Sequence, residues 1–148
     1  MQLKPYLHFN GQCEEAFAFY EKCLGAKIVM LMTYGSSPIA AQAPPGWQEK
    51  IVHATLTLSD QALGDQVLQG ADAFPEHYRK PQGFAISLNI QAAADADRIF
   101  SDLAANGTVQ LALQETFWAL RFGMLVDQFG TPWMINCQPN RDRQGVGS

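Results

Sequence analysis

The sequence has few charged residues and no concentrated basic segment, and this argues against a nucleic-acid partner. Charged residues make up 16% of the 148 residues, the formal net charge is −4, and the densest basic step is Arg79-Lys80. A nucleic-acid-binding surface needs lysines and arginines gathered on one face or along one helix. We therefore expect no nucleic-acid partner.

Long apolar runs and a cysteine framework are also missing. The longest apolar runs fall far short of the roughly 20 residues that a membrane-spanning helix needs. The opening residues, MQLKPYLHF, lack the apolar core of a secretory signal. Three cysteines, an odd number without a CxxC motif, predict no disulfide framework, and they are typical of small buried side chains. The sequence therefore indicates a cytoplasmic protein without a membrane partner.

What is present is enough apolar sequence for a core. Hydrophobic residues make up 47% of the chain, an ordinary share for a globular protein. A chain of 148 residues suits one compact domain, or two small half-domains that share a core. We expect residues 1–148 to form a single domain.

One hairpin pattern occurs twice in the sequence. In Met124–Asn136, two apolar runs flank Asp127-Gln128-Phe129-Gly130, which predicts strand, tight turn and strand. A fainter copy, Asp60-Gln61, also follows an apolar strand, 67 positions earlier (127 − 60). We interpret Asp60 and Asp127 as turn-forming residues. The repeat predicts a chain built from two copies of one unit.

Hydrophobic periodicity gives the same order of elements in both halves, strand, helix and three strands. The first half runs from Leu3 to Ala71, with its helix over Cys13–Leu24 and Gly25 as the cap. The second half runs from Gly83 to Cys137, with its helix over Ala93–Ala105. The strands are expected at 3–9, 28–34, 51–59 and 63–69, and at 83–90, 109–114, 120–126 and 132–137. The apolar strand 28–34 is expected to be covered on both faces. The fold class is therefore α+β.

The segment Gly35–Lys50 is too long and too rich in proline for a simple connection. Loops of this length are usually functional lids or mobile segments. Its one large aromatic residue is Trp47, which could fold over a bound molecule. We expect the segment to gate a cavity; a contact between subunits is the alternative.

Several short motifs together resemble the vicinal oxygen chelate superfamily, the glyoxalase and bleomycin-resistance proteins, and in particular its PhnB-like branch. The motifs are Pro5-Tyr6-Leu7, Asn10-Gly11, Glu15-Ala16-Phe17, Phe19-Tyr20, Met32-Thr33-Tyr34-Gly35, Ser37-Pro38, His53-Ala54, Glu115-Thr116-Phe117-Trp118, Asp127-Gln128-Phe129-Gly130 and Trp133-Met134-Ile135-Asn136. The resemblance covers residues 3–138. It implies two βαβββ units whose curved sheets line a cavity, helices on the outer faces, and a homodimer.

Alternation along the strands predicts which side chains face that cavity. The polar members of this face are Tyr6, His8, His53, Thr55, Ser87, Asn89 and Asn136. A buried face this polar costs stability unless water or a ligand satisfies it, so we expect a small-molecule ligand there. Trp47 and Trp118 are the aromatic residues expected to touch the ligand.

The resemblance also implies positions for a divalent metal, held in catalytic relatives by His, Glu or Gln of the first and closing strands. These positions fall here on Lys4 or Pro5, Phe84 or Ala85, Met134, and Val67 with Gln66 beside it. Lysine at neutral pH is a poor ligand, and the apolar side chains offer nothing to a hard cation. We therefore predict no metal and no cofactor.

Three functions stay open at this point. The first is a metal-independent small-molecule binding protein. The second is a lyase, isomerase or dioxygenase with a relocated metal site that includes His8 or His53, and the third is a drug-sequestering protein in which Trp47 and Trp118 stack on a flat ligand. Some relatives carry methyltransferase-like labels, but no glycine-rich strand-to-helix turn for a nucleotide-type cofactor is found.

Overall fold

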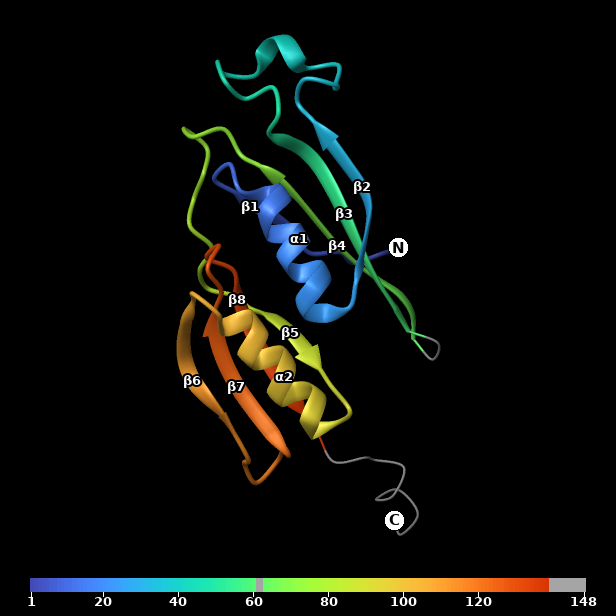
Figure 1. The fold of residues 1–148 in the computed structure, drawn as a ribbon, viewed down its shortest axis with the longest axis vertical. Coiled ribbons are helices and arrows are strands. Elements are labelled where there is room, and N and C mark those ends of the chain that lie inside the picture. Colours follow the sequence, from blue (N-terminus) through green and yellow to red (C-terminus); the bar gives the residue numbers. More distant parts are fainter. Residues whose placement is uncertain (61–62, 139–148) are drawn as a thin grey trace. The chain divides into compact units, whose positions relative to one another are not determined.

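The computed structural model describes residues 1–60 and 63–138, and the chain divides into two compact units, Met1–Arg79 and Lys80–Ser148 (Figure 1). Both units run strand, helix and three strands. The elements of the first unit are β1 (Tyr6–Phe9), α1 (Cys13–Leu24), β2 (Lys27–Thr33), β3 (Ile51–Asp60) and β4 (Gly64–Asp72), with a short 3₁₀ helix, Ala40–Gln42, between β2 and β3. Those of the second are β5 (Ile86–Asn89), α2 (Ala93–Ala104), β6 (Thr108–Gln114), β7 (Arg121–Val126) and β8 (Pro132–Cys137).

Each unit forms one four-stranded mixed sheet, and the two sheets have the same topology. The strand orders are β1-β4-β3-β2 and β5-β8-β7-β6. The first strand of each unit pairs in parallel with the last, and the remaining neighbours are antiparallel. The predicted α+β fold of two βαβββ units is confirmed.

The strand register matches the 67-residue spacing of the repeated hairpin. Thr55 pairs with Gln69 in the first sheet, and Phe122 pairs with Asn136 in the second. Likewise, Thr57 pairs with Val67, and Met124 with Met134. Each residue of the second hairpin therefore has a counterpart 67 positions earlier, as the repeat predicted.

One helix covers one face of each sheet, α1 in the first unit and α2 in the second (Figure 1). Helical spacing puts the apolar side chains of each helix on one side, where they pack on the alternate apolar side chains of the strands. In the first unit this core contains Leu7, Phe9, Ala16, Phe17, Tyr20, Ala54 and Leu56; in the second it contains Ala96, Phe100, Leu103, Leu125, Trp133 and Ile135. Gly25 ends α1 in the left-handed conformation, as predicted.

The turn between β7 and β8 is organised by the Asp127 carboxylate. Its Oδ1 accepts hydrogen bonds from the amides of Phe129 and Thr131 at 2.8 and 3.0 Å, and its Oδ2 accepts one from Trp133 Nε1 at 2.8 Å. Gly130 has φ 91°, which an L side chain rarely adopts. In the first unit, Asp60 Oδ1 accepts from the Leu63 amide at 2.9 Å, whereas Gln61 lies outside the described residues. Both aspartates therefore form turns, as predicted.

Some predicted details are wrong. The apolar strand β2 is not covered on both faces within the chain, because it is the edge of its sheet and Val29, Met30, Leu31 and Met32 are exposed. The first strand begins at Tyr6 rather than Leu3, and β4 continues to Asp72 rather than ending at Gln69. The parallel partner explains both limits, since β1 and β4 pair from Tyr6/Gln69 to Phe9/Asp72.

Candidate functional site

The first candidate site lies on the face of the first sheet that α1 does not cover, which we call the open face. Leu7 and Phe9 are buried on the helix side of β1, as are Ala54 and Leu56 on β3. Because side chains alternate along a strand, the residues at the alternate positions point to the open face. These residues are Tyr6, His8, His53 and Thr55, and their contact with a ligand stays a prediction.

The structure joins three of these side chains in a hydrogen-bonded chain. The Tyr6 hydroxyl lies 3.1 Å from His53 Nδ1, and His53 Nε2 lies 3.2 Å from Thr55 Oγ1. A neutral imidazole has one N–H and one acceptor nitrogen, so the phenol can donate to Nδ1 while Nε2 donates to the threonine. The chain therefore holds the His53 ring in one orientation on the open face.

The Tyr6 ring is the centre of this group. Its centroid lies 5.3 Å from that of His8 and 5.7 Å from that of His53. Burial, with a smaller effect of Cys13, raises the pKa of the Tyr6 phenol, so the hydroxyl stays protonated at neutral pH. Yet 42% of Tyr6 is exposed, which leaves the ring accessible to a ligand.

Gln69 belongs to the same open face, although the strand patterns did not single it out. It pairs with Tyr6 on one side and with Thr55 on the other, so its side chain lies between theirs. The signal that could have found it is the repeat, because Gln69 lies 67 positions before Asn136, which the sequence did single out.

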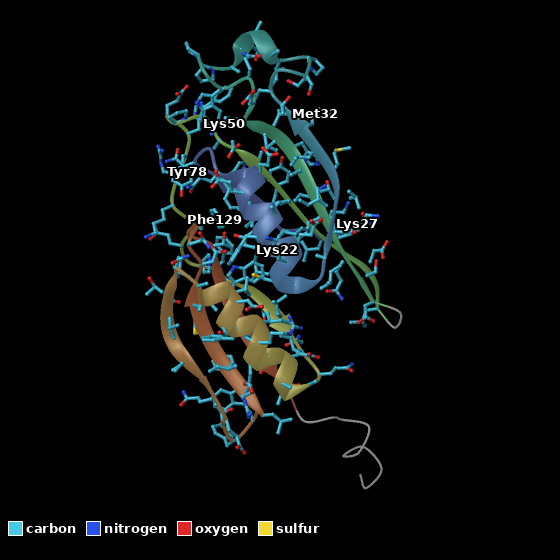
Figure 2. All side chains as sticks on the ribbon, viewed as in Figure 1. Lys22, Lys27, Met32, Lys50, Tyr78 and Phe129 are labelled. Carbon is cyan, nitrogen blue, oxygen red and sulfur yellow. The ribbon has the colours of Figure 1, made fainter. Side chains whose placement is uncertain are left out.

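Trp47 lies in a different group. Its ring centroid is 6.0 Å from that of Tyr34 and 5.9 Å from that of Phe74, and the buried Tyr34 hydroxyl donates to the Asp72 carbonyl at 2.7 Å. This packing holds the proline-rich segment at its base, where Met32 lies next to the last residue of β2 and Lys50 directly precedes β3 (Figure 2). The structure therefore does not bring Trp47 together with the Tyr6–His53 chain, and closure of the segment over a ligand stays a prediction.

The open face of the second sheet carries amides and aromatic rings. Asn136 Nδ2 donates to Asn89 Oδ1 at 3.1 Å, and Ser87 is exposed one alternate position earlier on β5. Phe122 pairs with Asn136 across β7 and β8, and its ring lies 5.6 Å from that of Trp118. All four residues predicted for this half therefore lie on or beside one face. The sequence analysis did not single out Phe122. Because Leu125 is buried on the helix side of β7 and side chains alternate along the strand, Phe122 points to the open face.

A hollow of about 460 Å³ lies toward the other end of this second face. Its lining includes Lys80, Phe84, Gln110, Met124, Val126 and Pro132. That volume is within the roughly 300–1,000 Å³ typical of small-molecule pockets. Lys80 and Gln110 were not predicted as site residues, because only tertiary contact brings the segment before β5 to the start of β6.

Among the implied metal positions only Gln66, beside Val67, has a side chain of a type that ligates the metal in catalytic relatives, and one amide does not make a site. Val67 and Met134 occupy equivalent register positions in the two sheets, and Phe84 is half-exposed in the lining of the hollow. Neither aliphatic nor aromatic carbon binds a hard cation, and a thioether is a soft ligand. Within residues 1–60 and 63–138, no three His, Cys, Asp or Glu side chains gather as a metal site would need. The residues present therefore do not fit the divalent metal of the catalytic relatives.

Two kinds of buried polar group are structural. Asp72, 1% exposed, accepts hydrogen bonds from the Cys13 amide at the start of α1 and the Ile51 amide at the start of β3, both at 2.9 Å. Burial raises the pKa of the Asp72 carboxyl, and the amides and Lys50 partly offset that effect. The cysteines Cys13, Cys23 and Cys137 are all buried, as predicted. Burial raises the pKa of the Cys13 and Cys137 thiols, so neither is an activated nucleophile.

In the described part of the chain, no helix combines the length and the apolar character needed to cross a membrane.

Comparisons with known proteins extend over nearly the whole chain. The family described as "3-demethylubiquinone-9 3-methyltransferase" matches residues 1–136. Protein YjdN of Escherichia coli is 39% identical over 144 residues, 92% of this chain and 95% of that protein. The crystal structure of protein PA1353 from Pseudomonas aeruginosa is 40% identical, with a TM-score of 0.83 over 95% of this chain and 99% of that one.

More distant structures identify the fold. A putative 3-demethylubiquinone-9 3-methyltransferase, PhnB protein, from Bacillus cereus is 22% identical, with a TM-score of 0.73 over 93% of this chain and 99% of that one. A glyoxalase/bleomycin resistance protein/dioxygenase family enzyme from Burkholderia phytofirmans is 14% identical, with a TM-score of 0.59 over 91% and 96%. The predicted fold and branch are both confirmed. The chain belongs to the PhnB-like 3-demethylubiquinone-9 3-methyltransferase family and has the glyoxalase/bleomycin-resistance fold.

Proposed function

We propose that this protein binds a small molecule on the open faces of its two sheets, without the superfamily's metal. The observation that carries the proposal is the Tyr6–His53–Thr55 chain, which orders polar side chains on a face that the core does not use. An exposed hydrogen bond adds little to stability, whereas an ordered and accessible donor–acceptor group suits ligand binding. The hollow beside Met124 supplies an apolar surface in the second unit.

The test is a screen of small metabolites by thermal shift, followed by titration of each stabilising compound. Ligand present at 100 times its Kd adds about 2.7 kcal/mol of stability, which a melting curve resolves. For a compound that contacts the first sheet, we expect His53→Ala to weaken binding at least tenfold without unfolding the domain. His77→Ala is the matched control, because His77 is exposed in the linker. If every stabilising compound binds both variants as it binds the wild type, the site is wrongly placed.

Metal independence has its own measurement. We expect protein purified without chelator to contain well under one equivalent of Zn, Ni, Mn or Fe per chain, because the implied positions hold Lys4 or Pro5, Phe84 or Ala85, Val67 and Met134. One full equivalent that disappears with His8→Ala or His53→Ala would instead support an enzyme with a relocated metal site.

A second candidate function is acid–base catalysis by His53. The specific observation in its favour is the 3.1 Å contact with the Tyr6 hydroxyl, since a general base needs a group that orients its ring. Turnover of a screened compound that is lost in His53→Ala, and that falls in Tyr6→Phe with binding intact, would identify this function. Binding without turnover for every hit would favour the binding protein.

We also propose that the protein is a homodimer in which the β2 edge is covered. Val29, Met30, Leu31 and Met32 expose between 37% and 54% of their surface along this edge. Exposed apolar edge strands are a liability unless they are covered. Light scattering should give twice the mass of one chain at micromolar concentration, and Leu31→Lys should shift it toward one chain. A single-chain mass that does not change on concentration would contradict this.

A further inference from the structure

We propose that the open face of the second sheet is specific for a planar, uncharged ring that carries a neighbouring N–H and C=O, as a lactam does. This inference rests on the proposed small-molecule-binding function and names the ligand class for one part of it. The site is the row of Asn89, Asn136 and Phe122, with Trp118 beside it.

The two amides of the site leave one hydrogen-bond donor and one acceptor available to a ligand. The bond from Asn136 Nδ2 to Asn89 Oδ1 fixes both side chains. Asn89 Nδ2 and Asn136 Oδ1 then make no hydrogen bond within residues 1–60 and 63–138, and both residues lie on the face away from α2. One amide therefore offers a donor and the other an acceptor. A ring with an acceptor C=O and a donor N–H can satisfy both at once.

The aromatic side chains beside the two amides provide a surface for a flat ring. Phe122 is directly opposite Asn136, so their side chains share a face about 5 Å apart at Cβ. The Trp118 ring lies 5.6 Å from Phe122, and 45% of Trp118 is exposed. Aromatic pairs attract flat rings by stacking and edge contacts, so a planar ligand can lie against Trp118 or Phe122 while it bonds to the amides.

The position of Trp118 is fixed by its own turn. The Thr116 amide donates to the Ala119 carbonyl at 3.0 Å, and the Ala119 amide donates to Thr116 Oγ1 at 3.1 Å. Ala119 is buried, which anchors the turn to the sheet. A tryptophan whose backbone is already held in a turn loses less conformational freedom on binding than one on a free loop, and this favours affinity.

The row of side chains that forms the site is neutral. The row across the sheet continues from Phe122 to Gln114, another amide. The nearest strand cation, Arg121, is engaged with Asp97 of α2 at 2.9 Å on the other side of the sheet. Neutral amides select by hydrogen-bond pattern rather than by charge, so the ligand class is uncharged. The first sheet differs at the equivalent positions, where Tyr6 and Gln69 replace the two asparagines.

The probe is 2-quinolone, and the matched control is N-methyl-2-quinolone, which keeps the flat ring and the C=O but has no N–H. We expect 2-quinolone to shift the side-chain amide NMR signals of Asn89 and Asn136, and to bind at least tenfold more tightly than its N-methyl analogue. Asn89→Leu and Trp118→Ala should each weaken binding at least tenfold, whereas His77→Ala, at an exposed position of the linker, should not change it. Melting curves check that each variant is folded.

Two outcomes would overturn the inference. The first is equal binding of the two quinolones, which would mean that stacking alone decides. The second is no shift of the Asn89 and Asn136 signals at saturating 2-quinolone. If a screened compound nevertheless binds through His53, the ligand class is wrong but the proposed binding function stands. If no compound binds either sheet, both fail.

Discussion

In both units a buried phenylalanine of the helix packs on a glycine of the sheet, but the glycine lies on a different strand in each unit. Phe17 of α1 and Phe100 of α2 are both buried against their sheet. A Cβ on Gly70 of β4 would lie 3.0 Å from the Phe17 ring, and one on Gly123 of β7 would lie 2.8 Å from the Phe100 ring. Each helix therefore needs one glycine beneath its phenylalanine, but the repeat does not decide which strand supplies it.

The open faces differ more than the cores. The same row holds Tyr6, Gln69 and Thr55 in the first sheet, and Asn89, Asn136 and Phe122 in the second. The first face therefore has titratable groups in and beside this row, whereas the row of the second face has neutral amides and an aromatic ring, and Lys80 lies in the hollow toward the other end of that face. Side chains that pack on a helix must fit a given volume, while those on the other face are free to change with the ligand. Substitutions can test these differences between the two units, first in the turns and cores and then on the open faces.

The largest expected difference is between the two turn aspartates. Asp127→Ala removes the acceptor of three hydrogen bonds, from Phe129, Thr131 and Trp133, and the loss of a buried hydrogen-bond partner costs roughly 1–3 kcal/mol, so the free energy of unfolding should fall by about 3–5 kcal/mol. Asp60 is exposed, and Asp60→Ala should cost about 0.5 kcal/mol or less. Urea denaturation of both variants measures this. Equal losses would show that burial does not distinguish the two turns.

The glycines beneath the two phenylalanines come next. Gly123→Ala should cost about 1–3 kcal/mol by overpacking, because the new Cβ would also meet the Leu113 Cα at 2.9 Å, which is backbone and cannot turn away. Gly70→Ala should cost less, since its two closest contacts are ring atoms of Phe17 at 3.0 Å. Thermal unfolding of the two variants gives the order. The reverse order would mean that the Phe100 side yields more easily than the geometry indicates.

Asp72 should add a pH-dependent effect to the first unit. The folded-state pKa of the Asp72 carboxyl is raised, so the native state binds more protons than the unfolded state does. The stabilisation from this group is therefore fully present below the unfolded-state pKa, near 3.8. It is then lost as pH rises through the raised folded-state pKa. Asp72→Asn should cost about 1–3 kcal/mol, because one amide loses its acceptor, and the wild type's advantage should be larger in acid than at pH 7. A pH-independent difference would contradict the raised pKa.

The smallest effects on stability are expected on the open faces. His53→Ala and Asn136→Leu remove one exposed or half-exposed hydrogen-bonded side chain from each sheet, and each should change the free energy of unfolding by about 0.5 kcal/mol or less. Urea denaturation in the absence of ligand makes the measurement. A loss above about 2 kcal/mol in either variant would assign that side chain to the fold rather than to binding.

Much of the first site could be predicted because a strand alternates with period two. Once Leu7, Phe9, Ala54 and Leu56 are taken as core, the directions of Tyr6, His8, His53 and Thr55 follow. The hydrogen bonds of His53 could not be predicted, because its partner Tyr6 is 47 residues away and the strand between them, β4, sets their distance. Gln69 was missed for the same reason.

The sequence by itself determined the repeat, the two helices, the turns at Asp60 and Asp127 and the alternation of each strand, since all of these depend on residues close together in the chain. Only the tertiary structure decided the parallel pairing of each first strand with its last, the exposure of β2 as an edge, and the packing of Trp47 on Tyr34 and Phe74. These features depend on which distant segments meet, and local periodicity carries no information about that choice.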